Sequence, residues 1–475
     1  MANDQEVRVE RGSVWSRRAV VGALACLVVA GLVTPTPAPP AGAAGSDGAA
    51  RVVAHRAGGR TVPATRLPSV VTQEVGHDAA EPTLGVARNG DLFYAAVEQI
   101  TGANPLPSID VLRSEDRGAT WEVASPRIAG QNVHASTGDP YVYVDRTSQG
   151  SRVFTVDLQG YLCSLLSFSD DGGETWTTNP LGCGRPYGDH QTVFAGRPVE
   201  GVTTLYPKIV YYCYQDVVSS ACSKSLDGDI TFVPAGGPSF PGIDASSGEF
   251  CGGLHGHGYA GPDGTIYIPK GHCGFPWFAL SKDEGSTWTR VQVADLGSAD
   301  HEASVAADAR GNVYYAYIAT NKLPYLVVSR DGGETWGKPL MVGRPGVVET
   351  SLPSLDIGKS GLVAVAYMGT RDAPNAETGY AAVEWDGYVT TTRNATARNP
   401  LFASTMVNEP ADPLLHGPCP QTKCGPVFDF IDVVVAPDDI VWGAFVDGCL
   451  VHCAGVPLSP NDGSAGLATR IRVPR

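Results

Sequence analysis

The sequence predicts an all-β fold, a β-propeller of four-stranded antiparallel blades, on three observations. With 57 Gly and 36 Pro in 475 residues, the chain is too rich in turn formers to be mostly helical. The phrase SRDGGETW, which begins at Ser329, recurs along the chain at nearly constant spacing. Around each copy the same order of short apolar strands repeats. Seven blades are favoured, and six are the alternative if one weak unit is an insertion.

Five copies of this phrase, called the turn motif below, set the repeat. The other copies are SEDRGATW at Ser114, SDDGGETW at Ser169, a degenerate SLDGDITF at Ser225 and SKDEGSTW at Ser281. Successive serines are 55, 56, 56 and 48 residues apart. A period of this length indicates supersecondary units that bury their apolar faces against their neighbours.

Each unit contains four predicted strands, which is the composition of a propeller blade. In the first unit the strands are Glu81 to Arg88, Asp91 to Glu98, Ile109 to Arg113 and Trp121 to Ser125. Later units begin near Asp139, Asp189, His255, His301, Glu349 and Phe428, and the last two units lack the turn motif.

The last unit has only three predicted strands, at about Phe428 to Ala436, Ile440 to Val446 and Leu467 to Val473. An unpaired sheet edge must be covered. We expect the segment Val62 to Thr72, which precedes the first unit, to supply the fourth strand and close the ring.

The first 45 residues predict an export signal and a Pro/Ala-rich linker, followed by a single propeller domain over residues 46–475. The uncharged run from Ala19 to Val33 is short for a membrane span, which needs about 20 residues, so a retained anchor is the alternative. The phrase SRRAVV at Ser16 resembles a twin-arginine signal. We therefore expect a secreted protein without a transmembrane span in the mature chain.

The acidity of the chain argues against nucleic-acid or anionic-membrane partners. The formal net charge is −15, and the first 45 residues carry +1, so the remainder is near −16. No Lys/Arg-rich run offsets the repulsion from phosphate. We expect a monomer.

Ten cysteines follow the predicted signal, an even number that predicts disulfides in an oxidising compartment. Zinc-binding spacings fit them poorly. Pairing between neighbours in the sequence gives Cys163 with Cys183, Cys213 with Cys222, Cys251 with Cys273, Cys419 with Cys424, and Cys449 with Cys453.

Each part of the turn motif has a structural task. Its Asp accepts backbone N–H bonds, its Gly supplies a positive φ, and its Trp packs between sheets. These residues resemble the Asp box, or BNR repeat, of sialidases and related propellers. The resemblance implies the propeller fold, whereas members of this superfamily include sialidases, other glycosidases, sugar-binding proteins and assembly factors.

A sialidase would use an arginine triad, an Asp acid/base, and a Tyr activated by Glu. Arg66-Leu67-Pro68-Ser69 is similar to the early Arg-Ile-Pro motif of that family, although it falls on the predicted closing strand. Arg185, Arg344 and Arg371 are loop arginines that would complete a triad, but nothing local selects them.

The starts of the innermost strands predict the functional site, because these strands run the same way and gather at one mouth of the channel. Clustered carboxylates there would raise one another's pKa and provide an acid beside a base, as glycosidic hydrolysis requires. Capping of backbone amides is the structural alternative for each residue, and a divalent metal held by the same ring is another.

The candidate catalytic residues are Asp189, His190, Asp300, His301, Glu302 and Glu349. The candidate substrate-binding residues are Glu81, Asp139, Arg185, Tyr187, His255, His257 and Trp277, and Asp429 or Asp432 represents the last unit in the same ring. We expect no cofactor, with a divalent metal as the alternative.

The phrase GHGYAG at Gly256 is followed by no predicted helix, so its glycines indicate close approach of the blades and not dinucleotide binding. Two hypotheses lead. One is a secreted, sialidase-like glycoside hydrolase that acts on a carbohydrate or glycoconjugate at the channel mouth. The other is a non-catalytic propeller that binds polysaccharide or protein, which a mouth plugged by the loop Asn408 to Pro426 would favour. A lyase or metal-dependent enzyme is a third.

Overall fold

The computed structural model describes residues 50–475 except 65, 99–107, 129–130, 133–136, 149, 160–162, 181–187, 217, 244–247, 249, 252, 375–378, 381–382, 420–423, 428 and 450–463. The predicted export signal lies outside these residues, as do Cys183, Cys453, Arg185 and Tyr187. In the described chain the one helical element is a short 3₁₀ helix, η1 (Gly425–Val427). No helix there is long and apolar enough to cross a membrane.

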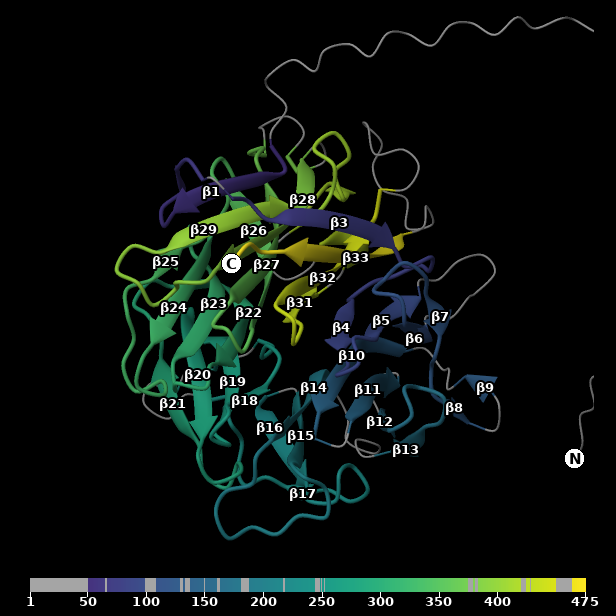
Figure 1. Cartoon of the computed structure of the whole chain (residues 1–475). Helices are drawn as coiled ribbons and strands as arrows, with labels where there is room; N and C mark the ends of the chain where they lie inside the picture. Colours follow the sequence, from purple (N-terminus) through teal and green to yellow (C-terminus); the bar gives the residue numbers. More distant parts are fainter. Residues whose placement is uncertain are drawn as a thin grey trace, which may run out of the picture. The chain divides into compact units, whose positions relative to one another are not determined.

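Six antiparallel sheets have four strands each (Figure 1). The first two are β4–β7 (Thr83–Val86, Leu92–Glu98, Ser108–Ser114, Glu122–Val123) and β10–β13 (Thr137–Arg146, Ser151–Gln159, Cys163–Ser169, Thr177–Asn179). The next are β14–β17 (Asp189–Gly196, Ile209–Gln215, Ser220–Ser225, Val233–Pro234) and β18–β21 (Tyr259–Ala260, Ile266–His272, Phe275–Ser281, Thr289–Gln292). The last two are β22–β25 (Ser298–Ala307, Val313–Ala319, Pro324–Ser329, Leu340–Met341) and β31–β33 (Asp432–Val435, Ile440–Asp447, Ala465–Arg472) completed by β3 (Ser69–Glu74).

A larger sheet is built on the meander β26–β29 (Glu349–Ile357, Val363–Thr370, Glu384–Thr392, Leu401–Met406). The strand β1 (Val52–Arg56) pairs with β29 along its full length, β2 (Arg60–Thr61) pairs with β1, and β30 (Leu415–His416) pairs with β28. The repeat did not predict β1, because its partner strand β29 lies about 350 residues further along the chain. A separate hairpin, β8–β9, contains Arg127–Ile128 and Gln131–Asn132.

The sheets form a closed ring. Inner strands β4, β10, β14, β18, β22, β26 and β31 pack in that order, each against the next, and β31 packs against β4. With the larger sheet counted as the sixth, seven blades follow one another. The prediction of an all-β propeller of four-stranded antiparallel blades is confirmed.

The start and the end of the chain close the last blade together, as predicted. Strand β3 pairs with β33 from Ser69↔Arg472 to Glu74↔Leu467, and Figure 1 shows the two side by side. The closing strand begins at Ser69, seven residues after the predicted start at Val62, and ends at Glu74, two residues after the predicted end at Thr72. Because β3 runs antiparallel to β33 at the outer edge, Arg66 precedes it at the end of the blade away from the inner-strand starts.

A belt of side-chain to backbone hydrogen bonds joins neighbouring inner strands. A hydroxyl or carboxylate oxygen on one strand accepts a hydrogen bond from a backbone N–H of the next blade, with N···O distances of 2.9–3.2 Å. The acceptor–donor pairs are Thr83–Val142, Thr192–Gly258, Ser304–Leu355, Ser354–Val433 and Asp432–Leu84. The last pair crosses the closure between the seventh and first blades.

Two glycines of the GHGYAG phrase let blades approach closely. A Cβ on Gly256 would lie 1.7 Å from the Ala303 carbonyl oxygen, and one on Gly258 would lie 2.2 Å from the Phe194 ring. Neither contact is tolerable, so the glycines serve packing at the channel.

The turn motif forms the blade corners. In the copy at Ser329, the Asp331 carboxylate accepts two hydrogen bonds from Thr335, one from its hydroxyl and one from its N–H at 2.9 Å. The Ser329 hydroxyl accepts a hydrogen bond from the Gly333 N–H. The Thr335 hydroxyl bond, then the backbone bond, lowers the pKa of Asp331 to about 2. The Trp336 ring packs 5.3 Å from Phe278 of the preceding blade.

Three predicted disulfides are present: Cys213–Cys222, Cys251–Cys273 and Cys419–Cys424. Cys213 and Cys222 are directly opposed on β15 and β16, as hairpin pairing predicts. The other two predicted pairs each include a cysteine outside the described residues.

Candidate functional site

Six polar side chains from five blades meet where the inner strands begin, the end of the ring called the mouth below. They form the axial cluster: Glu81, Asp139, Asp189, His190, Glu302 and Asp429. All except Asp189 are less than 10% exposed. The structure therefore brings together predicted site residues that are up to 348 positions apart in the sequence.

Three of these residues have a strained backbone conformation. Glu81, Asp139 and His190 have φ values of 51°, 48° and 51°, which non-glycine residues rarely adopt. The Asp139 N–H donates to the Glu81 carboxylate at 3.1 Å, and the His190 N–H donates to the Asp139 carboxylate at 2.8 Å. Asp139 and His190 are thus each held by the carboxylate of the preceding blade, next to a register shift in β10 or β14.

His190 is the cationic group of the axial cluster. Its Nε2 lies 3.2 Å from Glu302 Oε1. Burial by itself would lower the pKa of His190, but the charge and hydrogen bond of Glu302, then the charges of Asp139 and Asp429, raise it to about 10. The imidazole is therefore protonated at neutral pH.

The carboxyl groups differ from His190, because burial favours their uncharged form. Burial, then the nearby charges of Glu81 and Asp189, raises the pKa of Asp139 well above its usual value. Burial also raises the pKa of Glu302, although His190 opposes this. Carboxylate oxygens of Glu81, Asp139 and Asp429 lie within 4.8 Å of one another, which makes these three residues the candidate metal ligands.

Aromatic side chains close over the axial cluster. The Phe430 ring lies 5.3 Å from His190 and 5.1 Å from His257, edge to face with both. His257 stacks on His190 at 5.8 Å, and His255 lies 6.4 Å from it. Burial lowers the pKa of His255 to about 3 and lowers that of His257, so both imidazoles are neutral.

A second centre lies at the mouth of the fifth and sixth blades, and we call it the tyrosine centre. The Tyr380 hydroxyl lies 3.0 Å from both oxygens of Glu349, the first residue of β26. Lys322, in the turn between β23 and β24, donates to Glu349 at 2.9 Å and to Tyr380 at 3.0 Å. Hydrogen bonds to Tyr380, then to Glu349, raise the pKa of Lys322.

This geometry provides an activated phenol. Glu349 is placed to take the phenolic proton, and the Lys322 ammonium stabilises the phenolate that results. The Lys322 side chain is 38% exposed, so the tyrosine centre is open to solvent, unlike the axial cluster. Of the predicted catalytic residues, the structure therefore places Glu349 in a separate centre from His190.

Other predicted residues lie elsewhere or are not described. Trp277 sits in the third strand of the fourth blade, where its backbone oxygen accepts from Tyr315. Asp300 and His301 belong to β22, but the description of the chain does not extend to their side chains.

The candidate triad arginines in the described chain, Arg344 and Arg371, both have local partners. Arg344 is buried and donates to the backbone oxygens of Ala50, Arg51 and Ser404. Arg371 lies 3.6 Å from Asp386. Each of these two arginines therefore binds a local partner.

No sequence pattern predicted Tyr380, Lys322, Gln191 or Phe430. Tyr380 and Lys322 lie in connections without a motif and meet Glu349 only because adjacent blades bring them to the mouth. Gln191 and Phe430 directly follow predicted residues, His190 and Asp429. Both therefore lie one residue beyond a strand-start position that the repeat predicts.

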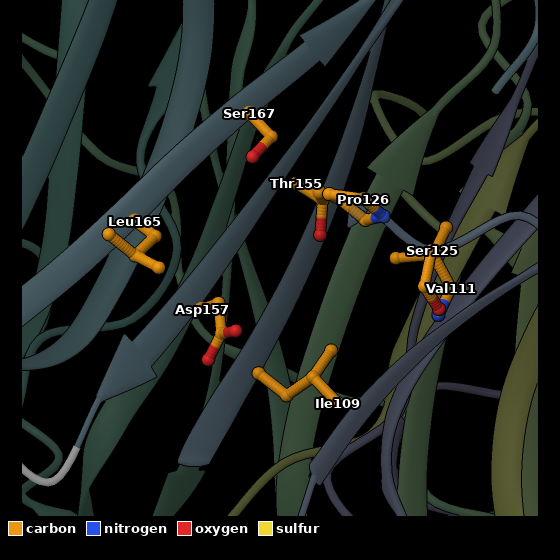
Figure 2. A pocket seen from close by; sticks show the side chains of 8 residues that line it. All are labelled: Ile109, Val111, Ser125, Pro126, Thr155, Asp157, Leu165 and Ser167. Atoms are coloured by element: carbon orange, nitrogen blue, oxygen red, sulfur yellow. The ribbon is translucent and has the colours of Figure 1, made fainter. Parts of the chain in front are cut away.

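A narrow hollow between the first two blades is not part of either centre. Figure 2 shows its lining side chains, including Thr155 and Asp157 of β11 and Leu165 and Ser167 of β12. These strands lie outside the inner ring, so we assign no function to the hollow.

No protein-family model matches the chain, and no curated protein matches it. Solved structures resemble it in fold. A protein of unknown function from Dyadobacter fermentans has a TM-score of 0.42 and 16% identity over 86% of this chain and 98% of that one. The intramolecular trans-sialidase from Ruminococcus gnavus has a TM-score of 0.40 and 14% identity over 84% and 96%. The Aleuria aurantia lectin in complex with a fucoside has a TM-score of 0.42 and 13% identity over 71% and 98%.

Proposed function

We propose that this protein is a carbohydrate-active propeller that hydrolyses glycosidic bonds at the tyrosine centre. The observation that carries the proposal is the placement of one phenol between a carboxylate and an ammonium group, at 3.0 Å from each. Its position at the mouth of a propeller with five Asp-box-like corners supports a glycan as the substrate.

In this scheme Tyr380 is the nucleophile of a retaining hydrolysis. Its proton passes to Glu349, the phenolate oxygen bonds to the anomeric carbon, and the glycosidic bond breaks. An acid protonates the departing oxygen, and water then hydrolyses the tyrosyl intermediate. Asp300, in the neighbouring strand β22 (Ser298–Ala307), is our candidate for that acid. The predicted signal and the disulfides support action outside the cell.

The test is turnover of a panel of fluorogenic glycosides, including the sialoside, by the purified mature protein. Tyr380→Phe removes the nucleophile, so kcat should fall at least about 10³-fold, and Glu349→Gln should lower it about 10²-fold. Both variants should keep the wild-type unfolding temperature within a few degrees.

Tyr314→Phe is the matched control, because Tyr314 also bonds a carboxylate, Asp308 at 3.1 Å, but at the opposite end of the fifth blade. Its turnover should equal that of the wild type. Failure of the wild-type protein on every glycoside would remove the enzymatic proposal. Full activity of Tyr380→Phe would remove the tyrosine centre from it.

A non-catalytic binding role is the second candidate. The segment that follows the loop 408–426 reaches across the mouth, since Val427 accepts the Glu81 N–H at 3.0 Å and Phe430 covers His190. This coverage favours a surface that binds glycans without cleaving them. Glycan-array binding without turnover would support it.

A further inference from the structure

The hollow between the first two blades lies where their apolar contact gives way to polar side chains. Val153, Thr155 and Asp157 alternate along β11 and therefore share one face of the second blade. Val153 belongs to an apolar cluster with Val111 of the first blade, whereas Thr155 and Asp157 line the hollow (Figure 2). A buried hydroxyl group on this face needs a hydrogen-bond partner.

Thr155 has no such partner in the protein. Its side chain is 2% exposed, and its Oγ1 has no hydrogen-bond partner among the described residues. Two other hydroxyl groups line the hollow, but both are engaged elsewhere. Ser167 shares a hydrogen bond of 2.8 Å with Thr178, and Ser125 accepts from a backbone N–H at 2.9 Å and donates to Asp110 at 3.3 Å. Because an unpaired buried hydroxyl destabilises the folded state, its partner is expected inside the hollow.

The hollow has room for one water molecule and is too small for a sugar. Its volume is ≈ 20 Å³, and a cavity needs at least about 10–15 Å³ by this measure to hold a water. Half of the residues that line it are apolar: Ile109, Val111, Pro126 and Leu165. A calcium ion takes about six to eight oxygen ligands, more than the remaining side chains offer. Water is therefore the ligand that fits.

Asp157 is placed to share this water with Thr155. Alternate residues of a strand lie about 6.6 Å apart, and two hydrogen bonds of about 2.8 Å through a water molecule span about 5.6 Å. The Thr155 hydroxyl can donate to the water, and the water can donate to the Asp157 carboxylate. Internal waters commonly make about two to four hydrogen bonds, so these two groups meet the lower limit.

We propose that the hollow binds one structural water molecule, which links the Thr155 hydroxyl to the Asp157 carboxylate between the first and second blades. The bridge completes the hydrogen bonding of β11 beside the apolar contact of Val111 with Val153. The inference goes beyond the glycosidase proposal and does not depend on it, because no residue of the hollow belongs to the tyrosine centre.

The first experiment is a high-resolution crystal structure of the mature protein. It should show a density peak, refined as water, within about 3.2 Å of Thr155 Oγ1 and of an Asp157 carboxylate oxygen. Thr155→Ser keeps the hydroxyl group and should keep the peak. Thr155→Val has nearly the same shape as the native side chain but no hydroxyl, so it should lose the peak.

The second experiment measures stability by chemical denaturation. Thr155→Val should raise the equilibrium constant for unfolding about 10-fold, because it breaks the water bridge. Thr405→Val is the matched control. Thr405 Oγ1 is also buried without a hydrogen-bond partner among the described residues, but Thr405 lies on β29 in the sixth blade and does not line the hollow. Removal of this unpaired hydroxyl should lower the unfolding constant at least about 5-fold.

A wild-type crystal structure without the density peak would overturn the proposal. So would a Thr155→Val variant that is stabilised as Thr405→Val is, since that result would mean that the Thr155 hydroxyl has no partner. Neither experiment uses glycan turnover, so the result does not depend on the proposed function.

Discussion

Asp229 occupies the position at which the other four copies of the turn motif have glycine. Its φ is 97°, its exposure is 0%, and neither carboxyl oxygen has a hydrogen-bond partner among the described residues. Burial, although opposed by Arg152, raises the pKa of Asp229 to about 9. This degenerate corner therefore holds a protonated carboxyl group in a strained conformation.

We predict that Asp229→Gly stabilises the protein by about 1–3 kcal/mol at pH 7, because glycine accepts the positive φ and leaves no buried carboxyl. The usual pKa of 3.8 applies in the unfolded chain, so unfolding releases a proton between that value and about pH 9. Wild-type stability from this group is complete below pH 3.8 and falls as the pH rises. The advantage of the variant should therefore widen from pH 4 to pH 8 in denaturant titrations.

The reciprocal change in the fourth blade is the control. Gly285 has a φ of 82°, and a Cβ there would lie 2.8 Å from the Ala235 side chain. Gly285→Asp should destabilise the protein at every pH. A constant difference between wild type and Asp229→Gly across the pH range would contradict the buried carboxyl.

At the scale of elements, the sequence predicted the repeating blade because its signals are local. The turn motif bonds to itself within seven residues, and strand alternation needs no distant partner. The strands β1 and β3 differ in this respect, since each pairs with a strand more than 340 residues away. The need to cover a three-stranded sheet revealed β3, whereas nothing in the repeat called for β1.

The tryptophan that ends the motif links adjacent blades. Trp336 packs 5.3 Å from Phe278 and 6.1 Å from Tyr315. In the degenerate third copy the same position is Phe232. One large ring at this position is therefore sufficient to fill the space between blades.

We predict that Trp336→Ala lowers the free energy of unfolding by about 2–4 kcal/mol, because it opens a cavity between the fourth and fifth blades. Trp336→Phe should cost about 1 kcal/mol, as the third blade accepts phenylalanine. Chemical denaturation measures both. Equal losses in the two variants would contradict the role of ring packing, because the indole N–H has no hydrogen-bond partner among the described residues.

At the scale of the whole molecule, stability depends on ring closure. Strand β3 is the one segment from before the first blade that pairs with β33 in the described chain, and the Asp432–Leu84 hydrogen bond crosses the same boundary. Without β3, the backbone groups of β33 would form an open sheet edge.

Two truncations test this. A chain that begins at residue 76 lacks β3 and should lose cooperative unfolding and aggregate, as size-exclusion chromatography and calorimetry would show. A chain that begins at residue 66 keeps β3 and loses only β1 and β2, so it should unfold cooperatively at a temperature about 5–10 °C lower. Similar behaviour of the two chains would mean that β3 is not the closing element.

The sequence by itself determined the blade, its corner chemistry, three disulfides and the group of acids and histidines that begin the inner strands, because each depends on residues close together in the chain. The tertiary structure alone decided how these acids divide between a closed axial cluster and an open tyrosine centre. Glu349 meets Lys322 and Tyr380, and Asp139 meets Glu81 and Asp429, only through the packing of neighbouring blades. Burial and charge at such junctions depend on contacts across the ring, which a linear repeat does not encode.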